Sequence, residues 1–230
     1  MTRSAVADVL FVAPPALLTH KRTLNANTVF SPHGVDAELF GRARDPATVV
    51  PELARGLQSP VVGYFGSLHD WIDLELIDWL AQSRPHWTFL LVGHAAADVS
   101  SLRARGNVVL AGARPYAELP GWAKAFDVAI IPYRLNRQVL NANPLKLREY
   151  LATGKPVVSV SNPEIDTFAH VVGIAQGRED FLARIELALA DDTPDASAKR
   201  IAAVAGDTWD ARVDAVVARV VDALQSPAAA

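Results

Sequence analysis

The sequence of 230 residues contains no cysteine. Disulfide bonds, thiolate nucleophiles and cysteine metal ligands are therefore excluded, and this absence fits a cytoplasmic protein. The histidines and carboxylates do not occur at the helical spacing of metal ligands, so we expect no metal site. Lysine and arginine number 22 against 25 acidic residues and form no basic stripe, so the sequence gives no sign of a nucleic-acid partner.

The sequence also lacks a long hydrophobic run. The apolar stretch near its start covers only residues 9–13, which is too short for a signal-peptide core or a membrane span. We therefore expect any membrane association to be peripheral and at the inner face of the membrane. Half of the residues are hydrophobic and a fifth are charged, a composition typical of globular proteins.

Short apolar segments alternate with amphipathic segments along the chain. The apolar segments are rich in Val, Ile, Leu and Phe without strict alternation, which predicts strands buried on both faces. This order predicts an α/β fold with a Rossmann-like parallel sheet and helices on both faces. The expected strands are 7–12, 60–65, 87–92, 107–110, 127–131, 156–160 and 171–175, and the expected helices are 70–82, 98–105, 116–125, 145–152, 178–190 and 208–224.

Capping residues mark two of these helices. We expect Asp70 to cap the helix over 70–82, with Asp73 adding a second negative charge to its first turn. Gly154 is expected to end the helix over 145–152, because glycine tolerates positive φ. In the last helix one face is apolar and needs a surface to pack on; this face holds Trp209, Val213, Val216, Val217, Val220 and Leu224.

Glycines and polar residues follow several expected strands. In an open parallel sheet, ligands bind beyond the carboxyl ends of the strands, where helix N-termini offer free N–H groups. The loop after 127–131 is the longest and most polar, and it leads into the helix that carries Lys146 and Glu149. The other candidates at this rim are Gly66, Ser67, His69, His94, Gly112, Arg114, Arg134 and Arg137.

Lys146 and Glu149 allow two interpretations. Leu147, Tyr150 and Leu151 share the core side of the helix, which turns Lys146 and Glu149 toward the rim. There the carboxylate can hold vicinal hydroxyls while the ammonium and helix N–H groups meet phosphate oxygens, as a ribose diphosphate requires. Spacing alone favours an ordinary surface ion pair between them.

The other rim residues also have plain explanations. Gly66 can simply make a tight turn. Isolated histidines such as His69 and His94 are usually solvated. Arg134 and Arg137 either form a solvated face or line a phosphate pocket.

Several stretches in order carry a family pattern. They are PVVGYFGSLHDWIDLELI, WTFLLVG, NVVLAGARPYAELPGWAKAFDVAIIPY, NPLKLREYLATGKPVVSVSNPEI and TWDARV, of which PLKLREYLATGKPVVS is the most specific. Together they resemble the C-terminal domain of GT-B glycosyltransferases that use nucleotide-sugar donors, and the likeness covers residues 28–224. The resemblance implies that the donor-binding domain is present, while the N-terminal domain, which supplies the acceptor site and most catalytic residues, is mostly absent.

The same resemblance implies a division of the chain. Residues 1–36 are expected to be a remnant of the N-terminal domain together with the interdomain hinge, which matches SPHGVD with His33, Gly34, Val35 and Asp36. Residues 37–205 are expected to form the Rossmann-like nucleotide-sugar-binding domain, and 206–230 the C-terminal helix and tail.

Site residues are carried over position by position. Glu149 matches the glutamate that holds the ribose hydroxyls, the 143–146 loop matches the backbone near the diphosphate, and the loop around Arg114 matches the grip on the base. Many retaining members have a second glutamate where this chain has Asn141. The set implied for the nucleotide sugar is Gly66, Ser67, His69, Gly112, Ala113, Arg114, Arg134, Asn141, Asn143, Pro144, Leu145, Lys146 and Glu149.

The function implied is a hexosyltransferase-like glycosyltransferase of polysaccharide biosynthesis, or its donor-binding half. It would transfer a sugar from a UDP-, GDP- or dTDP-sugar to a saccharide or lipid-linked acceptor, with no cofactor besides this substrate. Lys, Arg and helix-dipole groups can stabilise the leaving diphosphate without metal. The alternatives are a non-catalytic nucleotide-sugar-binding module, a subunit completed by a separate N-terminal-type acceptor domain, and a sugar-nucleotide epimerase of the same fold.

Overall fold

The computed structural model describes residues 6–225. Its main body is built on a six-stranded sheet with the order β5-β4-β3-β6-β7-β8. All neighbouring strands pair in parallel, which confirms the predicted Rossmann-like α/β fold. The strands are β3 (Val61–Phe65), β4 (Thr88–Val92), β5 (Val108–Gly112), β6 (Val128–Ile131), β7 (Val157–Val160) and β8 (Gly173–Ala175).

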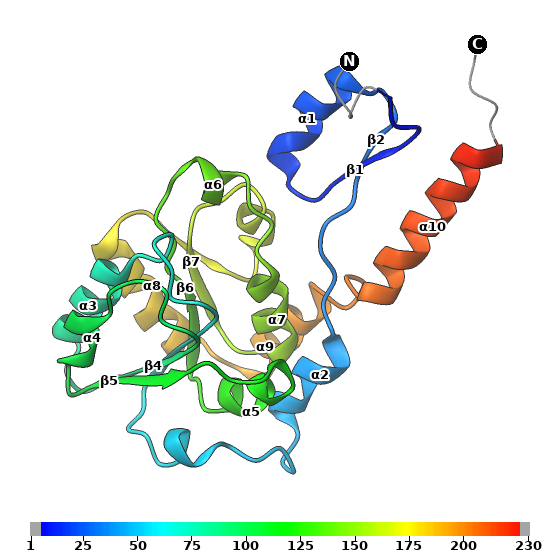
Figure 1. The fold of residues 1–230 in the computed structure, drawn as a ribbon. Helices are drawn as coiled ribbons and strands as arrows, with labels where there is room; N and C mark the ends of the chain where they lie inside the picture. Colours follow the sequence, from blue (N-terminus) through cyan, green and yellow to red (C-terminus); the bar gives the residue numbers. More distant parts are fainter. Residues whose placement is uncertain (1–5, 226–230) are drawn as a thin grey trace.

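Helices cover both faces of this sheet (Figure 1). On one face α3 (Leu74–Ser83) contacts both α4 (Ser100–Arg103) and α8 (Arg178–Ala190). On the other face α5 (Leu119–Lys124) contacts α7 (Leu145–Thr153), and α2 (Ala37–Gly41) and α9 (Pro194–Ala202) pack against α7. The short helix α6 is Arg137–Leu140, and 3₁₀ turns cover Arg42–Arg44, Glu52–Ala54, Tyr116–Glu118 and Ile165–Phe168.

The central strands are fully buried, as the unalternating apolar segments predict. Every residue of β3, β4 and β6 is buried between the two helix layers. Gly63 in β3 allows a close approach, because a Cβ at this position would lie 2.0 Å from the ring of Phe126. This glycine therefore serves packing in the core.

A smaller unit precedes the main body. The strands β1 (Leu10–Val12) and β2 (Thr28–Phe30) pair in parallel and are joined by α1 (Pro15–Leu24). Figure 1 shows this unit apart from the large sheet, with α10 (Trp209–Gln225) extending from the main body beside it. Arg219 of α10 donates a hydrogen bond to Asn27 of the small unit.

The apolar face of α10 stays uncovered in the described part of the chain. No residue of this helix is buried. Trp209, Val213 and Leu224 are 43%, 56% and 80% exposed, respectively. The sequence correctly predicts the apolar face, but residues 6–225 do not supply the surface that covers it.

The prediction that Asp70 caps the first long helix is wrong. The helix α3 begins at Leu74, and Asp73 is its N-cap, with a side chain that accepts a hydrogen bond from the Leu76 N–H at 3.0 Å. The chain stays non-helical up to this point because it is bonded to the loop after β6. Asp73 N–H donates to Pro132 O at 2.7 Å, and Arg134 N–H donates to Trp71 O at 2.8 Å. Tertiary hydrogen bonds thus delay the start of the helix.

Gly154 ends α7 as predicted. Its φ of 79° places it in the left-handed region, and its N–H donates to Leu151 O at 2.9 Å. A side chain at this position is disfavoured by the backbone and by contact, because a Cβ would lie 2.4 Å from Ser197 Oγ of α9. The same glycine therefore stops one helix and allows another to pack against it.

Candidate functional site

The strand order reverses between β3 and β6. These strands are neighbours in the sheet, although β4 and β5 lie between them in the chain. This reversal is the topological switch point of the sheet, and ligands of open α/β sheets bind in the crevice beyond the carboxyl ends of the strands at such a point. The loop after β3, the loop after β6 and the start of α7 meet at this point.

Lys146 lies across the carboxyl ends of β3 and β6. A Cβ on Gly66 would be 2.9 Å from Lys146 Cε and 3.0 Å from Nζ. The ammonium donates to the Tyr133 hydroxyl at 3.3 Å and lies 5.4 Å and 5.6 Å from the ring centroids of Tyr64 and Tyr133. The rings of Tyr64 and Tyr133 therefore hold Lys146 in place. Its side chain occupies space that only a glycine at position 66 leaves free.

Lys146 carries a positive charge at neutral pH because its pKa is raised. Burial lowers the pKa of Lys146, but the neighbouring Tyr133 and Tyr64 hydroxyls and the Glu149 carboxylate more than offset it, so that the pKa is raised overall. Burial raises the pKa of Tyr64 to about 12, which keeps its hydroxyl neutral. The switch point therefore presents a fixed positive charge beside two phenolic hydroxyls.

Glu149 lies one turn further along α7 and is 7% exposed. Its Oε1 accepts a hydrogen bond from the Tyr116 hydroxyl at 2.8 Å, and its other oxygen accepts none from the described residues. Burial raises the pKa of Glu149, while the Tyr116 hydrogen bond and the charge of Lys146 act in the opposite direction. One oxygen is thus bonded to Tyr116, and the second is an acceptor that the described residues do not use.

The ordinary surface ion pair between Lys146 and Glu149 is not formed. Each side chain takes a tyrosine as its hydrogen-bond partner, Tyr133 for the lysine and Tyr116 for the glutamate. The sequence interpretation missed Tyr64, Tyr116 and Tyr133. Tyr116 and Tyr133 follow closely after expected strands, and that position was the available signal.

The loops after β3 and β4 are in direct contact. A Cβ on Gly93 would lie 1.9 Å from the carbonyl oxygen of Gly66, and Gly66 N–H donates to Val92 O at 2.8 Å. Ser67 is exposed, and its hydroxyl donates to His94 O at 3.4 Å. Gly66 and Ser67 therefore lie in a loop that packs directly against the loop after β4.

The loop after β5 forms the next part of the rim. Gly112 has a φ of +72°, and the Arg114 side chain folds back to donate to Ala111 O at 3.0 Å and 2.7 Å. The guanidinium carbon of Arg114 lies 5.0 Å from the ring centroid of Trp122. Ala113 is exposed beside it. Tyr116, which bonds to Glu149, connects this loop to α7.

Two expected residues are engaged elsewhere. Arg134 pairs with Glu75 at 3.1 Å and lies 3.9 Å from Asp73, so two carboxylates at the start of α3 balance its charge. His69 stacks on Trp71 with 3.8 Å between the ring centroids. Neither is brought to Lys146, whose positive charge lies at the switch point itself.

The two asparagines before α7 have different surroundings. Asn141 ends the short helix α6, where its side chain donates to Arg137 O at 2.6 Å. Asn143 is buried, and its backbone carbonyl oxygen accepts a hydrogen bond from the His33 ring at 2.9 Å. Its side-chain amide donates to Ala13 O at 3.2 Å. Asn143 therefore fixes the loop before α7 to the segments that precede the main body.

The start of α7 has no side-chain cap among the described residues. Pro144 occupies the N-cap position, and Leu145 in the first turn is 41% exposed. Uncapped N–H groups and the positive end of the helix dipole favour anions. This end of α7 lies beside the ammonium of Lys146.

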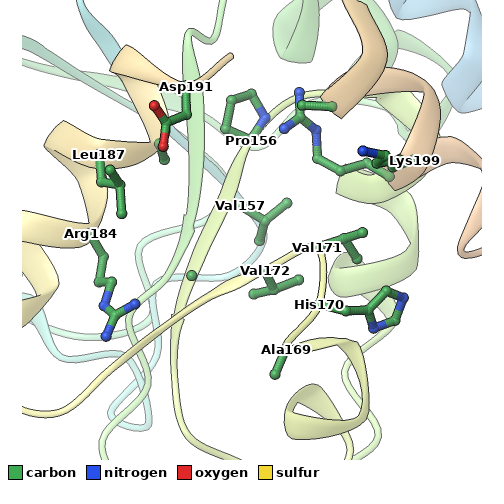
Figure 2. Close-up of a pocket in the computed structure, with 14 residues that line it drawn as sticks. Pro156, Val157, Ala169, His170, Val171, Val172, Arg184, Leu187, Asp191 and Lys199 are labelled. Carbon is green, nitrogen blue, oxygen red and sulfur yellow. The ribbon is translucent and has the colours of Figure 1, made fainter. Parts of the chain in front are cut away.

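A cavity of about 280 Å³ lies at the opposite end of the sheet. It borders the amino ends of β7 and β8, at Pro156 and Gly173. Figure 2 shows Val157 and Val172 between Arg184 on one side and Lys199 on the other. Neither Lys146 nor Glu149 lines this cavity.

Within residues 6–225, no three His, Asp or Glu side chains are grouped closely enough to hold a metal ion. In the same range, every helix is too short or too polar to cross a membrane.

Residues 59–207 match the family model described as Glycosyl transferases group 1. The chain belongs to this family. TuaH of Bacillus subtilis (strain 168), named as a teichuronic acid biosynthesis glycosyltransferase, is 34% identical over 135 residues, which cover 57% of this chain and 34% of TuaH. The chain thus spans about a third of the length of this relative.

Solved structures confirm the GT-B fold. HepE from Anabaena, determined in complex with UDP and glucose, matches with a TM-score of 0.66 and 19% identity over 94% of this chain and 63% of that one. Sucrose-phosphate synthase from Thermosynechococcus elongatus matches with a TM-score of 0.72 and 20% identity over 95% of this chain and 59% of that one. The predicted resemblance to the C-terminal domain of these enzymes is therefore confirmed.

Proposed function

We propose that residues 37–205 bind a nucleoside diphosphate sugar and act as the donor half of a glycosyltransferase. The observation that carries this proposal is the pair of Lys146 and Glu149 on α7 at the β3/β6 switch point, with the ammonium beside Gly66 and one Glu149 oxygen left without a partner among residues 6–225. Family membership of residues 59–207 supports the same function.

Each part of the donor has a matching part of the site. Lys146 and the open N-terminus of α7 would hold the diphosphate, because both offer positive charge or N–H groups. Glu149 would accept hydrogen bonds from the ribose hydroxyls, and the loop with Gly112, Ala113 and Arg114 would contact the base. UDP is the favoured nucleotide, because HepE was determined with it.

The chemistry proposed for these residues is stabilisation of the leaving group. When the bond between sugar and diphosphate breaks, negative charge grows on the phosphate oxygens. A fixed ammonium and a helix N-terminus stabilise that charge without reorganising. Ser67 and the backbone at Gly66 would form the floor under the phosphates.

The acceptor would be a saccharide or a lipid-linked saccharide of polysaccharide biosynthesis, which the TuaH match supports. We place this reaction in the cytoplasm, with contact to a membrane only at its surface. Exclusion of water and positioning of the acceptor require a second wall over the crevice. A further N-terminal-type domain would provide this wall, in the same chain or in a partner.

Calorimetric titration with UDP, GDP and dTDP tests the donor site. We expect at least one of them to bind, and Glu149→Gln to weaken binding about tenfold or more, because a hydrogen bond to a charged acceptor contributes about 1.5–3 kcal/mol. Glu186→Gln is the control, because Glu186 pairs with Arg84 away from the crevice. The proposal is wrong if none of the three nucleotides binds, or if both variants bind like the wild type.

Turnover separates an enzyme from a binding module. Release of UDP from UDP-sugars by this chain, with or without a saccharide acceptor, supports a complete catalyst. Binding without turnover, followed by activity when an acceptor domain is added, supports a donor subunit.

A further inference from the structure

Arg148 is a buried cation on α7, between Lys146 and Glu149 in sequence. Its side chain is 3% exposed. The guanidinium donates to Glu164 Oε1 at 2.5 Å and to Asp207 Oδ2 at 2.8 Å. A third hydrogen bond reaches Asn143 Oδ1 at 3.3 Å, so one side chain joins three acceptors from separate parts of the chain.

Two of these acceptors belong to residues that are also bonded to residues 33–35. We call residues 33–35 the entering segment, because the chain passes through them from the small unit into the main body. The Oδ1 atom of Asn143 also accepts from His33 N–H at 3.4 Å, and the Asn143 carbonyl accepts from the His33 ring at 2.9 Å. The Asp207 carbonyl accepts from Val35 N–H at 2.8 Å. Arg148 therefore lies at the centre of a bonded group that includes residues 33–35, although these are more than 100 positions away in sequence.

The third part of this group is the start of α10. Asp207 is also paired with Arg212 in the first turns of this helix. Val35 forms a parallel bridge with Thr208, and a Cβ on Gly34 would lie 2.7 Å from the backbone of Trp209. The entering segment and the start of α10 are thus packed in contact and share the partners of Arg148.

Stability alone does not explain such an arrangement. Burying an ion pair costs desolvation energy that its Coulomb attraction repays only with good geometry, and apolar replacements are often equally stable. A buried guanidinium with three acceptors does specify the orientation of its partners. Its N–H donors lie in one plane, so the acceptors must take one arrangement around it. Here the partners determine where the 143–146 loop and the start of α7 lie.

We propose that Arg148 is a positioning residue for the donor site. Its guanidinium fixes the 143–146 loop, and with it Lys146, to residues 33–35 and to Asp207 at the start of α10. Nucleotide binding and the conformation of the entering segment are therefore coupled through this group, and the coupling is reciprocal. The binding part of this inference rests on the proposed function, and the positioning part does not.

Hydrogen exchange of backbone amides in the wild type and in the double variant Arg148→Met/Glu164→Gln tests the positioning role. The second substitution removes the carboxylate that would otherwise be left buried without a partner, so the variant is expected to fold. We expect exchange to rise at least tenfold at residues 33–35 and at Leu147, whose N–H donates to Pro144 O at 3.3 Å, and to stay within threefold in β3, β4 and β6. The positioning role is overturned if exchange at 33–35 is unchanged, or if it rises uniformly over the sheet.

A matched control is Arg105→Met/Asp78→Asn. This double variant removes another double hydrogen bond between arginine and carboxylate, of 2.8 Å and 2.7 Å, on the α3 side of the sheet. We expect exchange to rise around α3 and to stay unchanged at 33–35. Equal effects of both double variants at 33–35 would show a general loss of stability instead of positioning.

Addition of UDP tests the coupling. In the wild type UDP should slow exchange at residues 33–35, and in the Arg148→Met/Glu164→Gln variant this protection should disappear while the affinity for UDP falls about tenfold. Unchanged affinity and unchanged protection in the variant would overturn the coupling. If UDP does not bind the wild type, the proposed nucleotide fails, and the exchange of the ligand-free variant still decides whether Arg148 positions the loop.

Discussion

Lys146 Nζ occupies the space beside Gly66, where a Cβ on Gly66 would be only 3.0 Å from the ammonium. The two residues are 80 positions apart in the chain and belong to different sheet connections. Their contact gives the crevice its fixed positive charge over the loop after β3. It also predicts which substitutions damage the site.

Gly66→Ala should weaken nucleotide binding by displacing Lys146. The backbone at Gly66 has a φ of +133°, so alanine also brings strain of about 1–3 kcal/mol. Gly56→Ala is the control, because Gly56 has a φ of +75° and open space around its Cβ position. Thermal unfolding should show both variants destabilised, whereas calorimetry should show loss of UDP affinity for Gly66→Ala alone.

Lys146→Met should weaken the binding of UDP by about tenfold to a hundredfold, because a hydrogen bond to a charged group contributes about 1.5–3 kcal/mol. The affinity for uridine, which has no phosphates, should stay nearly the same. Lys199→Met, at an exposed lysine beside the cavity of Figure 2, is the control and should not change either affinity. Equal losses for UDP and uridine would contradict a role of Lys146 at the diphosphate.

Glu149 should make stability depend on pH in a defined direction. Its pKa is raised by burial above the ordinary value of 4.5, so the folded protein binds this proton more tightly than the unfolded chain does. The contribution of Glu149 to the free energy of unfolding is therefore greatest below pH 4.5 and falls as pH rises through the folded pKa. Urea unfolding of the wild type and Glu149→Gln from pH 4 to pH 8 measures the difference.

In that series the stability of the wild type relative to Glu149→Gln should decrease with rising pH. Affinity for UDP should change in the opposite direction in the wild type if Glu149 holds the ribose hydroxyls as proposed, because an ionised carboxylate is a stronger acceptor than a carboxylic acid. A stability difference that is independent of pH would show that Glu149 titrates as in the unfolded chain.

Gly34→Ala should destabilise the junction between the entering segment and α10. The new methyl group would lie 2.7 Å from the backbone of Trp209, and overpacking of this kind costs about 1–3 kcal/mol. Gly106→Ala provides the control, because a Cβ there meets nothing within 4 Å. A drop in the thermal midpoint for Gly34→Ala and no drop for Gly106→Ala is the expected result.

The helix over 145–153 shows how far the sequence carries the candidate site. Its apolar spacing predicts that Leu147, Tyr150 and Leu151 face the core, and all three are buried. Gly154 predicts its end. Lys146 contacts Gly66 in the loop after β3 and Glu149 contacts Tyr116 after β5, and the ion-pair alternative is ruled out only by their tyrosine partners. Tyrosines from distant loops cannot be assigned to them by spacing.

Two other helices, α9 and α3, were missed or misplaced for different reasons. The sequence interpretation did not include α9, although Thr193 caps this helix and Pro194 occupies its first position, which is a usual start signal. The start of α3 was placed too early because hydrogen bonds to residues 132–134 hold the preceding residues out of the helix. Local signals were present in the first case and overridden by tertiary contacts in the second.

The sequence by itself determined the alternation of strands and helices, the parallel sheet and the side of α7 that faces the crevice, because these follow from apolar periodicity and from the backbone limits of glycine. Only the tertiary structure decided that Arg148 is buried, since its partners Glu164 and Asp207 lie 16 and 59 residues further along the chain. A helix pattern predicts that a charged residue is exposed to solvent. Distant segments that neutralise the charge can bury it in the folded protein, and the local pattern does not contain them.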